Sequence, residues 1–201
     1  MRKYSILALV TISLLLSAMA PLRASSIFIN GSDTPDYLAT ANYTPFTDTV
    51  NGITASFTGS TDPLSFQITP TSGYVTWGPE MLLTNNLGST LTIDFGQDLD
   101  TISMDFGTYT NDPLELTLYL GGNQVGSPVQ ETGTQILTDG LYEGNIGLSG
   151  QAFDSVVVSD ASSGLPVFGV GNITVADAPE PCFFWVFPAF GAGLGLWKRR
   201  G

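Results

Sequence analysis

Between residues 25 and 177 the sequence alternates apolar and polar residues with a period of two, and no stretch there shows the 3.6-residue period of a helix. The stretches that carry this pattern are STLTIDF (89–95), TISMDFG (101–107), PLELTLYL (113–120), FDSVVVSD (153–160) and VFGVGNITV (167–175). Successive side chains of a strand point to opposite faces of a sheet, so the alternation predicts strands with one buried face.

The segments between these stretches are rich in turn-forming residues. GQDLD (96–100) and GTYTNDP (107–113) are predicted turns, and GGNQ (121–124) is a predicted hairpin turn. Ser- and Gly-rich ASSGLP (161–166) joins the last two strands, and residues 30–51 are expected to form a long loop with at most one short strand. Strands at short intervals predict an all-β, antiparallel β-sandwich of jelly-roll-like type, and about 150 residues suffice for a core without disulfides.

The charged residues are distributed very unevenly. All 18 Asp and Glu residues lie between Asp33 and Glu180, and the sequence contains no His. The basic residues stand at the two ends: Arg2, Lys3, Arg23, Lys198, Arg199 and Arg200. The acidic middle therefore lacks the cations that bind phosphates, which excludes nucleic acid as a partner and disfavours an anionic lipid surface.

The same composition removes most catalytic chemistry from residues 25–177. Without His or Lys there is no Ser-His-Asp triad, and without His or Cys no usual transition-metal site. A carboxylate pair, as in glycoside hydrolysis, stays open as an alternative. Asp94 and Asp105 are expected on polar faces of adjacent strands, where solvent-facing carboxylates are the simpler interpretation. We expect the chain not to be an enzyme and to use no cofactor.

Residues 1–24 have the three-part pattern of a secretory signal peptide, with an expected N-terminal helix. Two basic residues precede an apolar run from Ile6 to Leu16, and small residues follow. The run is too short to span a bilayer permanently. Cleavage is expected after Ala24; cleavage after Ala20, the alternative, would leave a proline directly behind the cut. The pattern predicts export, with signal peptidase as a processing partner.

The end of the chain, residues 178–201, has three parts in a fixed order. They are the triplet Pro179-Glu180-Pro181, the uncharged run from Cys182 to Trp197, and the basic residues Lys198, Arg199 and Arg200. As a hydrophobic helix the run is shorter than the ~20 residues needed to span a bilayer, and the basic end is a stop signal on the cytoplasmic side. A short hydrophobic tail behind a marked site is the arrangement of a sorting signal that is later removed.

This tail resembles the PEP-CTERM sorting signal of Gram-negative bacteria. The resemblance implies processing by exosortase, an integral-membrane enzyme, after a transient stay in the inner membrane. It also implies delivery of the domain to the cell surface or extracellular matrix, among exopolysaccharides and in biofilms. The acidic β-sandwich of residues 25–177 loosely resembles the domains that precede such tails, which implies a structural or carbohydrate-binding-like module. A permanently tail-anchored periplasmic protein is the alternative, and a carboxylate-dependent glycan-active enzyme is another.

Two kinds of binding residue are candidates in the middle domain. Trp77, its one tryptophan, lies with Tyr74 in GYVTWGPE, and an exposed aromatic ring of this kind can stack on a sugar. The candidate calcium ligands are the oxygen-bearing side chains of Asn30, Asp33 and Asp36, with capping of turns as their alternative role. Related domains often end in a strand of the form IDN. Here VGN places Gly171 at the middle position, which removes one candidate ligand.

Overall fold

The computed structural model describes residues 24–27, 43–50, 52–60, 64–78, 80–84, 87–138, 140–161 and 167–177. These residues contain strands and turns but no helix, which confirms the predicted all-β class. The predicted helices of the signal peptide and of the tail lie outside the described residues. Within the described ranges no helix has the length and hydrophobicity needed to cross a bilayer.

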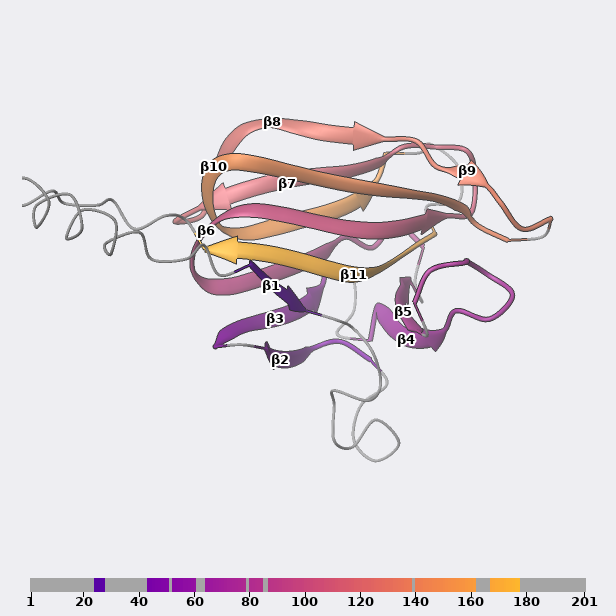
Figure 1. Ribbon diagram of the computed structural model, residues 1–201, viewed down its shortest axis with the longest axis horizontal. Helices are drawn as coiled ribbons and strands as arrows, with labels where there is room; N and C mark the ends of the chain where they lie inside the picture. Colours follow the sequence, from indigo (N-terminus) through magenta and orange to yellow (C-terminus); the bar gives the residue numbers. More distant parts are fainter. Residues whose placement is uncertain are drawn as a thin grey trace, which may run out of the picture.

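The described residues form eleven strands (Figure 1). They are β1 (Ala24–Ile27), β2 (Phe46–Val50), β3 (Ile53–Gly59), β4 (Phe66–Pro70), β5 (Glu80–Thr84), β6 (Leu91–Thr108), β7 (Leu114–Leu120), β8 (Asn123–Glu131), β9 (Thr134–Gln135), β10 (Tyr142–Asp160) and β11 (Phe168–Asp177). The strand β2 is the one short strand expected within residues 30–51. Residues 30–42 and 51 of that segment lie outside the described ranges.

The strands form two layers that share β6 and β10, and every pair is antiparallel. In the first layer β4, β5, β11, the second half of β6, the first half of β10 and β9 follow one another, with β1 also on β11. In the second layer the order is β2, β3, the first half of β6, the second half of β10, β7 and β8. The predicted antiparallel β-sandwich is therefore confirmed.

The two long strands pass from one layer to the other at a corner, visible where β6 and β10 bend in Figure 1. The pairing of β6 with β10 shifts register between Ser149 and Ser155, while Leu99 stays opposite Phe153. Gly96 and Gly150 have φ angles of 62° and 81° at this corner. Glycine tolerates this left-handed conformation, which lets a strand bulge and bend without ending.

This corner corrects one prediction. The segment 96–100 was expected to be a turn between two strands, but it lies inside β6. Its Leu99 is fully buried and paired, so the chain bends there and remains part of the sheet. The other two turns are confirmed: β6 ends at Thr108 and β7 starts at Leu114, and the 121–124 hairpin joins β7 to β8.

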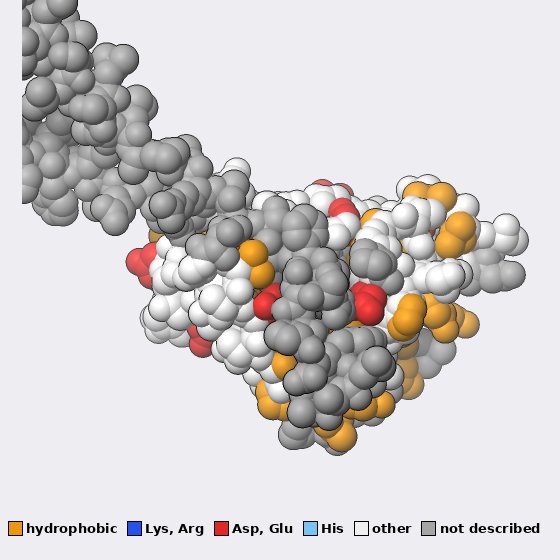
Figure 2. Space-filling view, turned by 60° about the horizontal axis from the view of Figure 1, so that its bottom comes forward, with side chains coloured by type: hydrophobic (Ala, Val, Ile, Leu, Met, Phe, Trp, Pro, Cys, Tyr) orange, Lys and Arg blue, Asp and Glu red, His pale blue; other side chains and the backbone are white. Residues whose placement is uncertain are grey.

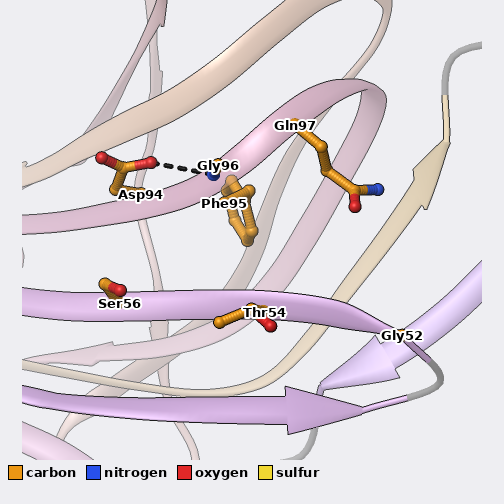
Figure 3. A pocket seen from close by; sticks show the side chains of 7 residues that line it. All are labelled: Gly52, Thr54, Ser56, Asp94, Phe95, Gly96 and Gln97. Carbon is orange, nitrogen blue, oxygen red and sulfur yellow. Dashed lines mark hydrogen bonds between the residues drawn. The ribbon is translucent and has the colours of Figure 1, made fainter.

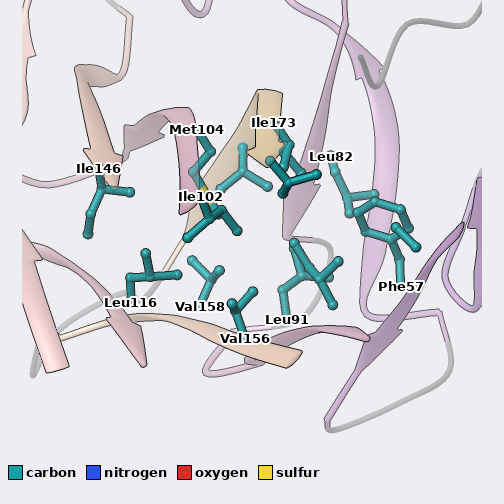
Figure 4. Packing of buried hydrophobic residues seen from close by; sticks show 14 of the residues in the cluster. Phe57, Leu82, Leu91, Ile102, Met104, Leu116, Ile146, Val156, Val158 and Ile173 are labelled. Atoms are coloured by element: carbon teal, nitrogen blue, oxygen red, sulfur yellow. The ribbon is translucent and has the colours of Figure 1, made fainter. Parts of the chain in front are cut away.

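The core lies between the two layers and is built from the apolar positions of the alternating strands (Figure 4). On β6, for example, Ile93, Ile102 and Met104 are all buried while their neighbours face outward. Aromatic rings connect the layers: the ring centroids of Phe95 and Phe153 are 6.0 Å apart in an edge-on contact. Each fully buried side chain of this size contributes about 1.5–3 kcal/mol, which explains why no disulfide is needed.

A second, smaller apolar cluster covers part of the outward face of the first layer. It consists of Val75, Met81 and Leu141 with the partly buried Trp77 and Leu83. Beneath it the sheet carries glycine: a Cβ at Gly107 would lie 2.9 Å from Val75 Cγ1, and one at Gly169 would lie 2.8 Å from Met81 Sδ. These glycines leave room for the segment between β4 and β5 to pack onto the sheet.

Candidate functional site

The loop between β4 and β5 closes on itself. The hydroxyl of Thr71 donates to the carbonyl of Gly78 at 2.6 Å. The carbonyl of Thr71 accepts from the amides of Tyr74 at 2.9 Å and Val75 at 3.2 Å. These short-range hydrogen bonds pair backbone N–H and C=O groups within a segment whose Ser, Gly and Thr residues favour turns. The loop therefore holds Trp77 on a defined backbone.

Two further contacts fix the same loop to the first layer. The backbone amide and the hydroxyl of Thr76 both donate to Glu143 Oε2, at 2.9 and 2.6 Å. The amide of Leu141 donates to the carbonyl of Tyr74 at 2.8 Å. Glu143 lies on β10 and is buried, so its two bonds with Thr76 are shielded from water and hold the loop against the sheet.

The ring of Trp77 lies against Gly171 of β11. A Cβ built at position 171 would overlap Cζ3 of the ring, so glycine is required for this contact. The ring is half-buried, and its Nε1 is shielded from solvent with no hydrogen-bond partner in the described part of the chain. Tyr74, the other predicted sugar contact, lies in the same loop with 46% of its surface exposed.

A row of polar side chains lies beside this ring on the outward face of the first layer. Asn145 Nδ2 donates to Asp105 Oδ1 at 2.9 Å, and Asn172 Nδ2 donates to Asp105 Oδ2 at 2.7 Å. The hydroxyl of Ser103 donates to Asn145 Oδ1 at 3.0 Å. Each oxygen of the Asp105 carboxylate is thus oriented by an amide from a neighbouring strand.

Strand register brings these residues together. Asp105 on the central strand β6 pairs with Asn145 of β10 on one side and with Gly171 of β11 on the other. The register of β11 shifts after Gly171, and Asn172 has a φ of 46°, so this bulge turns the Asn172 side chain toward Asp105. We name Trp77, Ser103, Asp105, Asn145 and Asn172 the Trp77 site.

The loop between β4 and β5 lies against the polar row as well as against Gly171. A Cβ at Gly78 would lie 3.3 Å from Asn172 Oδ1, which places the residue after Trp77 directly beside the row. Four separate segments of the chain therefore contribute to the site: they supply the aromatic ring, the carboxylate and the two side-chain amides. The sequence indicated Trp77 as a candidate and Asp105 only as a solvent-facing acid. Asn145 and Asn172 were not predicted, because their only signal is a polar residue at an outward strand position.

A hollow lies on the other layer (Figure 3). It has a volume of about 410 Å³ and is lined by Gly52, Thr54, Ser56, Asp94, Phe95, Gly96 and Gln97. Within it Asp94 Oδ1 accepts a hydrogen bond from the Gly96 amide at 2.9 Å. The carboxylate of Asp94 is therefore used to stabilise the bend of β6.

This geometry corrects the expected placement of Asp94 and Asp105. The two residues were placed on adjacent strands, but both belong to β6. Asp94 pairs with Ser56 of the second layer, and Asp105 pairs with Gly171 of the first. Since each side chain points outward from its own layer, the two carboxylates face away from each other and cannot act on one bond.

The remaining predicted residues lie outside the described ranges. These are the calcium candidates Asn30, Asp33 and Asp36, the triplet Pro179-Glu180-Pro181, and the basic end Lys198, Arg199 and Arg200. Among the side chains that the structure describes, no three His, Cys, Asp or Glu residues gather as metal ligands. Figure 2 shows carboxylates scattered over one face, and hydrophobic side chains gathered at the right and at the lower edge of the view.

No protein-family model and no curated protein matches the sequence. Solved structures do resemble it. A mutant family 29 carbohydrate-binding module complexed with mannohexaose has a TM-score of 0.43 and 8% identity, over 78% of this chain and 93% of that one. The family 32 module of C. perfringens NanJ, in complex with galactose, has a TM-score of 0.40 and 9% identity, over 61% and 93%. The K2 cleaved adhesin domain of Lys-gingipain has a TM-score of 0.49 and 10% identity, over 76% and 99%.

Proposed function

We propose that the chain is an exported β-sandwich module that binds carbohydrate at the Trp77 site and has no enzymatic activity. The observation that carries this proposal is the half-buried ring of Trp77, held against Gly171 beside the oriented carboxylate of Asp105. The class of ligand follows from the mixture of groups. A sugar offers an apolar ring face to an aromatic side chain and hydroxyl groups to polar ones.

The polar row supplies both kinds of hydrogen-bonding group. An ionised carboxylate accepts about four hydrogen bonds in all, and the two amides use two of those of Asp105. Its remaining capacity suits sugar hydroxyls. Because the loop and the row are already fixed by internal hydrogen bonds, little conformational freedom is lost when a ligand binds.

The carboxylates near the site support binding rather than catalysis. Glycoside hydrolysis needs two carboxyl groups facing one glycosidic bond, one of them a proton donor to the leaving oxygen. A second acid, Glu143, lies close to Asn145 on β10. It is buried, and one of its carboxylate oxygens accepts both hydrogen bonds from Thr76. Of these two acids, Asp105 is the one whose carboxylate belongs to the polar row.

Delivery is the second part of the proposal. Removal of the signal peptide, followed by exosortase cleavage near Pro179-Glu180-Pro181, would release the domain to the cell surface or the extracellular matrix. The ordered triplet, apolar run and basic end support this route. A permanently anchored periplasmic protein, with the tail retained, is the alternative. Either way the binding module would meet polysaccharide outside the cytoplasm.

Binding can be tested with the full chain in which Trp185 and Trp197 are replaced by Phe, so that fluorescence reports Trp77 alone. A neutral polysaccharide should shift the emission, and Trp77→Ala should abolish binding measured by calorimetry. Its loss of stability should stay below the ~3–5 kcal/mol of a fully buried tryptophan. Tyr119→Ala, on β7 of the second layer, is the control and should leave binding intact. Unchanged affinity in Trp77→Ala would refute the site.

Processing is tested by intact-mass measurement on protein from an exosortase-bearing host. The mature chain should start near residue 25 and end near Pro181. Replacing Glu180 with Ala should leave the tail attached and keep the protein in the membrane fraction. Wild-type protein that still carries residues 198–201 would refute the sorting proposal and favour the permanently anchored form.

A further inference from the structure

We infer that the Trp77 site prefers a sugar that carries a positive charge, an amino sugar with a free ammonium group, over neutral and acidic sugars. This inference rests on the proposed function and names its ligand class. Its basis is the charge of the whole domain together with the groups that the site presents. Both favour a cation at the same place.

The surrounding field is uniformly negative. From residue 24 to residue 197 the chain contains no Lys, Arg or His, while all 18 acids lie in that interval. Residues 24–197 therefore supply no cationic side chain that could neutralise these carboxylates. Such a field attracts a positively charged ligand and repels an acidic one, and it does so most strongly at low ionic strength.

The site concentrates this preference at Asp105. Its oxygens receive amide donors from Asn145 at 2.9 Å and Asn172 at 2.7 Å, which fix the carboxylate on the outward face of β6. An ammonium group has three donors and no acceptor, so it complements the remaining lone pairs of that carboxylate. Such a charge-assisted bond is about twice as strong as one between neutral groups.

The aromatic ring acts in the same direction. Trp77 lies on Gly171, the residue that pairs with Asp105, so ring and carboxylate are neighbours across two strands. The face of a tryptophan attracts a cation electrostatically as well as stacking on the sugar ring. A uronic acid, by contrast, would bring a second carboxylate to Asp105 with no cationic side chain to compensate it.

Asp94 offers a matched control for the role of Asp105. It is an acid on the same strand, but it faces outward from the second layer, in the hollow of Figure 3. Asp94→Asn removes one negative charge and keeps an oxygen to accept the Gly96 amide. Asp105→Asn removes the same charge from the Trp77 site. The two variants therefore separate a local effect from the effect of net charge.

The experiment is calorimetric titration of the full chain at pH 6 with three tetrasaccharides: glucosamine, N-acetylglucosamine and galacturonic acid. We expect the glucosamine oligomer to bind roughly tenfold more tightly than its acetylated form, as one charge-assisted hydrogen bond allows. The galacturonic acid oligomer should not bind. Asp105→Asn should remove the tenfold preference, and Asp94→Asn should keep it. Raising the salt concentration should reduce the preference in the unmodified chain.

Each other outcome overturns the inference in a recognisable way. If Asp94→Asn and Asp105→Asn reduced the preference for the glucosamine oligomer equally, diffuse charge attraction and not the Trp77 site would be its cause. Tighter binding of the acetylated or the galacturonic acid oligomer would overturn the ammonium preference and leave the proposed carbohydrate function standing. Failure of all three oligomers to bind would overturn the proposed function together with the inference.

Discussion

The indole ring of Trp77 rests on Gly171, and any side chain larger than hydrogen at position 171 would overlap its Cζ3 atom. The neighbouring outward position on β11 is also glycine, and there the overlap would be with Met81. Glycine usually weakens a strand, because it has no side chain to pack. Here it lets the loop between β4 and β5 lie directly on the sheet and present Trp77 beside Asp105.

Gly171→Ala should therefore displace the Trp77 ring and weaken carbohydrate binding. The added methyl group meets a rigid indole, so we expect a loss of about 1–3 kcal/mol in stability, as for other overpacked sites. Gly169→Ala is the matched control, because its Cβ would lie 2.8 Å from the flexible Met81 side chain. Thermal unfolding and titration of both variants check this. Full affinity in Gly171→Ala would show that the ring position is irrelevant to binding.

Thr76→Val should loosen the loop that carries Trp77. The change keeps the shape of the side chain but removes the hydroxyl that donates to the buried Glu143 carboxylate at 2.6 Å. We expect a stability loss of about 1–2 kcal/mol, since a bond to a charged group is broken. Limited proteolysis should show faster cutting within residues 71–78. Thr101→Val, which removes a hydroxyl bond to the adjacent Asp100, should change neither measurement.

The alternating pattern was sufficient to predict the class of the fold. Stretches such as 89–95 and 153–160 were found because hydrophobic burial at every second residue is a local property of the sequence. The strand β3 (Ile53–Gly59) was not predicted, although its burial alternates in the same way. The bend within β6 was not found, because Gly96 and the polar residues after it have the composition of a turn. What keeps the segment in the sheet is a long-range pairing of Leu99 with Phe153, which the local sequence does not contain.

The candidate site was predictable only in part, for a related reason. Trp77 is a single conspicuous residue, whereas Asn145 and Asn172 look like any other polar residue at an outward position. Their meeting at Asp105 depends on strand register and on the bulge of β11 at Asn172. Register is set by the packing of whole strands, so it is decided by the tertiary fold.

Gly96→Ala should destabilise the corner of the sandwich without any steric clash. The φ angle of Gly96 is 62°, and a Cβ there would meet no atom within 4 Å, so the cost is conformational alone. A residue with a side chain loses roughly 1–2 kcal/mol in this left-handed region. Asn tolerates it better, so Gly96→Asn should be the milder change despite its greater size. Chemical denaturation compares the free energies of unfolding of the two variants. A larger loss of stability in Gly96→Asn than in Gly96→Ala would indicate steric crowding.

The stability of the domain should rise with salt concentration. Its carboxylates repel one another and have no cationic side chain between residues 24 and 197 to attract, so screening removes repulsion and breaks no salt bridge there. The Debye length falls from ~30 Å at 0.01 M to ~8 Å at 0.15 M, a range comparable to spacings within a domain. We expect the melting temperature to increase by several degrees over this range, since ~1 kcal/mol corresponds to ~2–4 °C at this size.

The measurement is thermal unfolding in sodium chloride with a chelator present, repeated with potassium chloride. Equal increases in the two salts would identify screening as the cause, because screening depends on ionic strength and not on the identity of the ion. A melting temperature that stays constant or falls would mean that attraction between carboxylates and backbone amides, such as that of Asp94 for Gly96, outweighs their mutual repulsion. A much larger increase with millimolar calcium at matched ionic strength would instead indicate a specific cation site, and Asn30, Asp33 and Asp36 would be the first residues to replace.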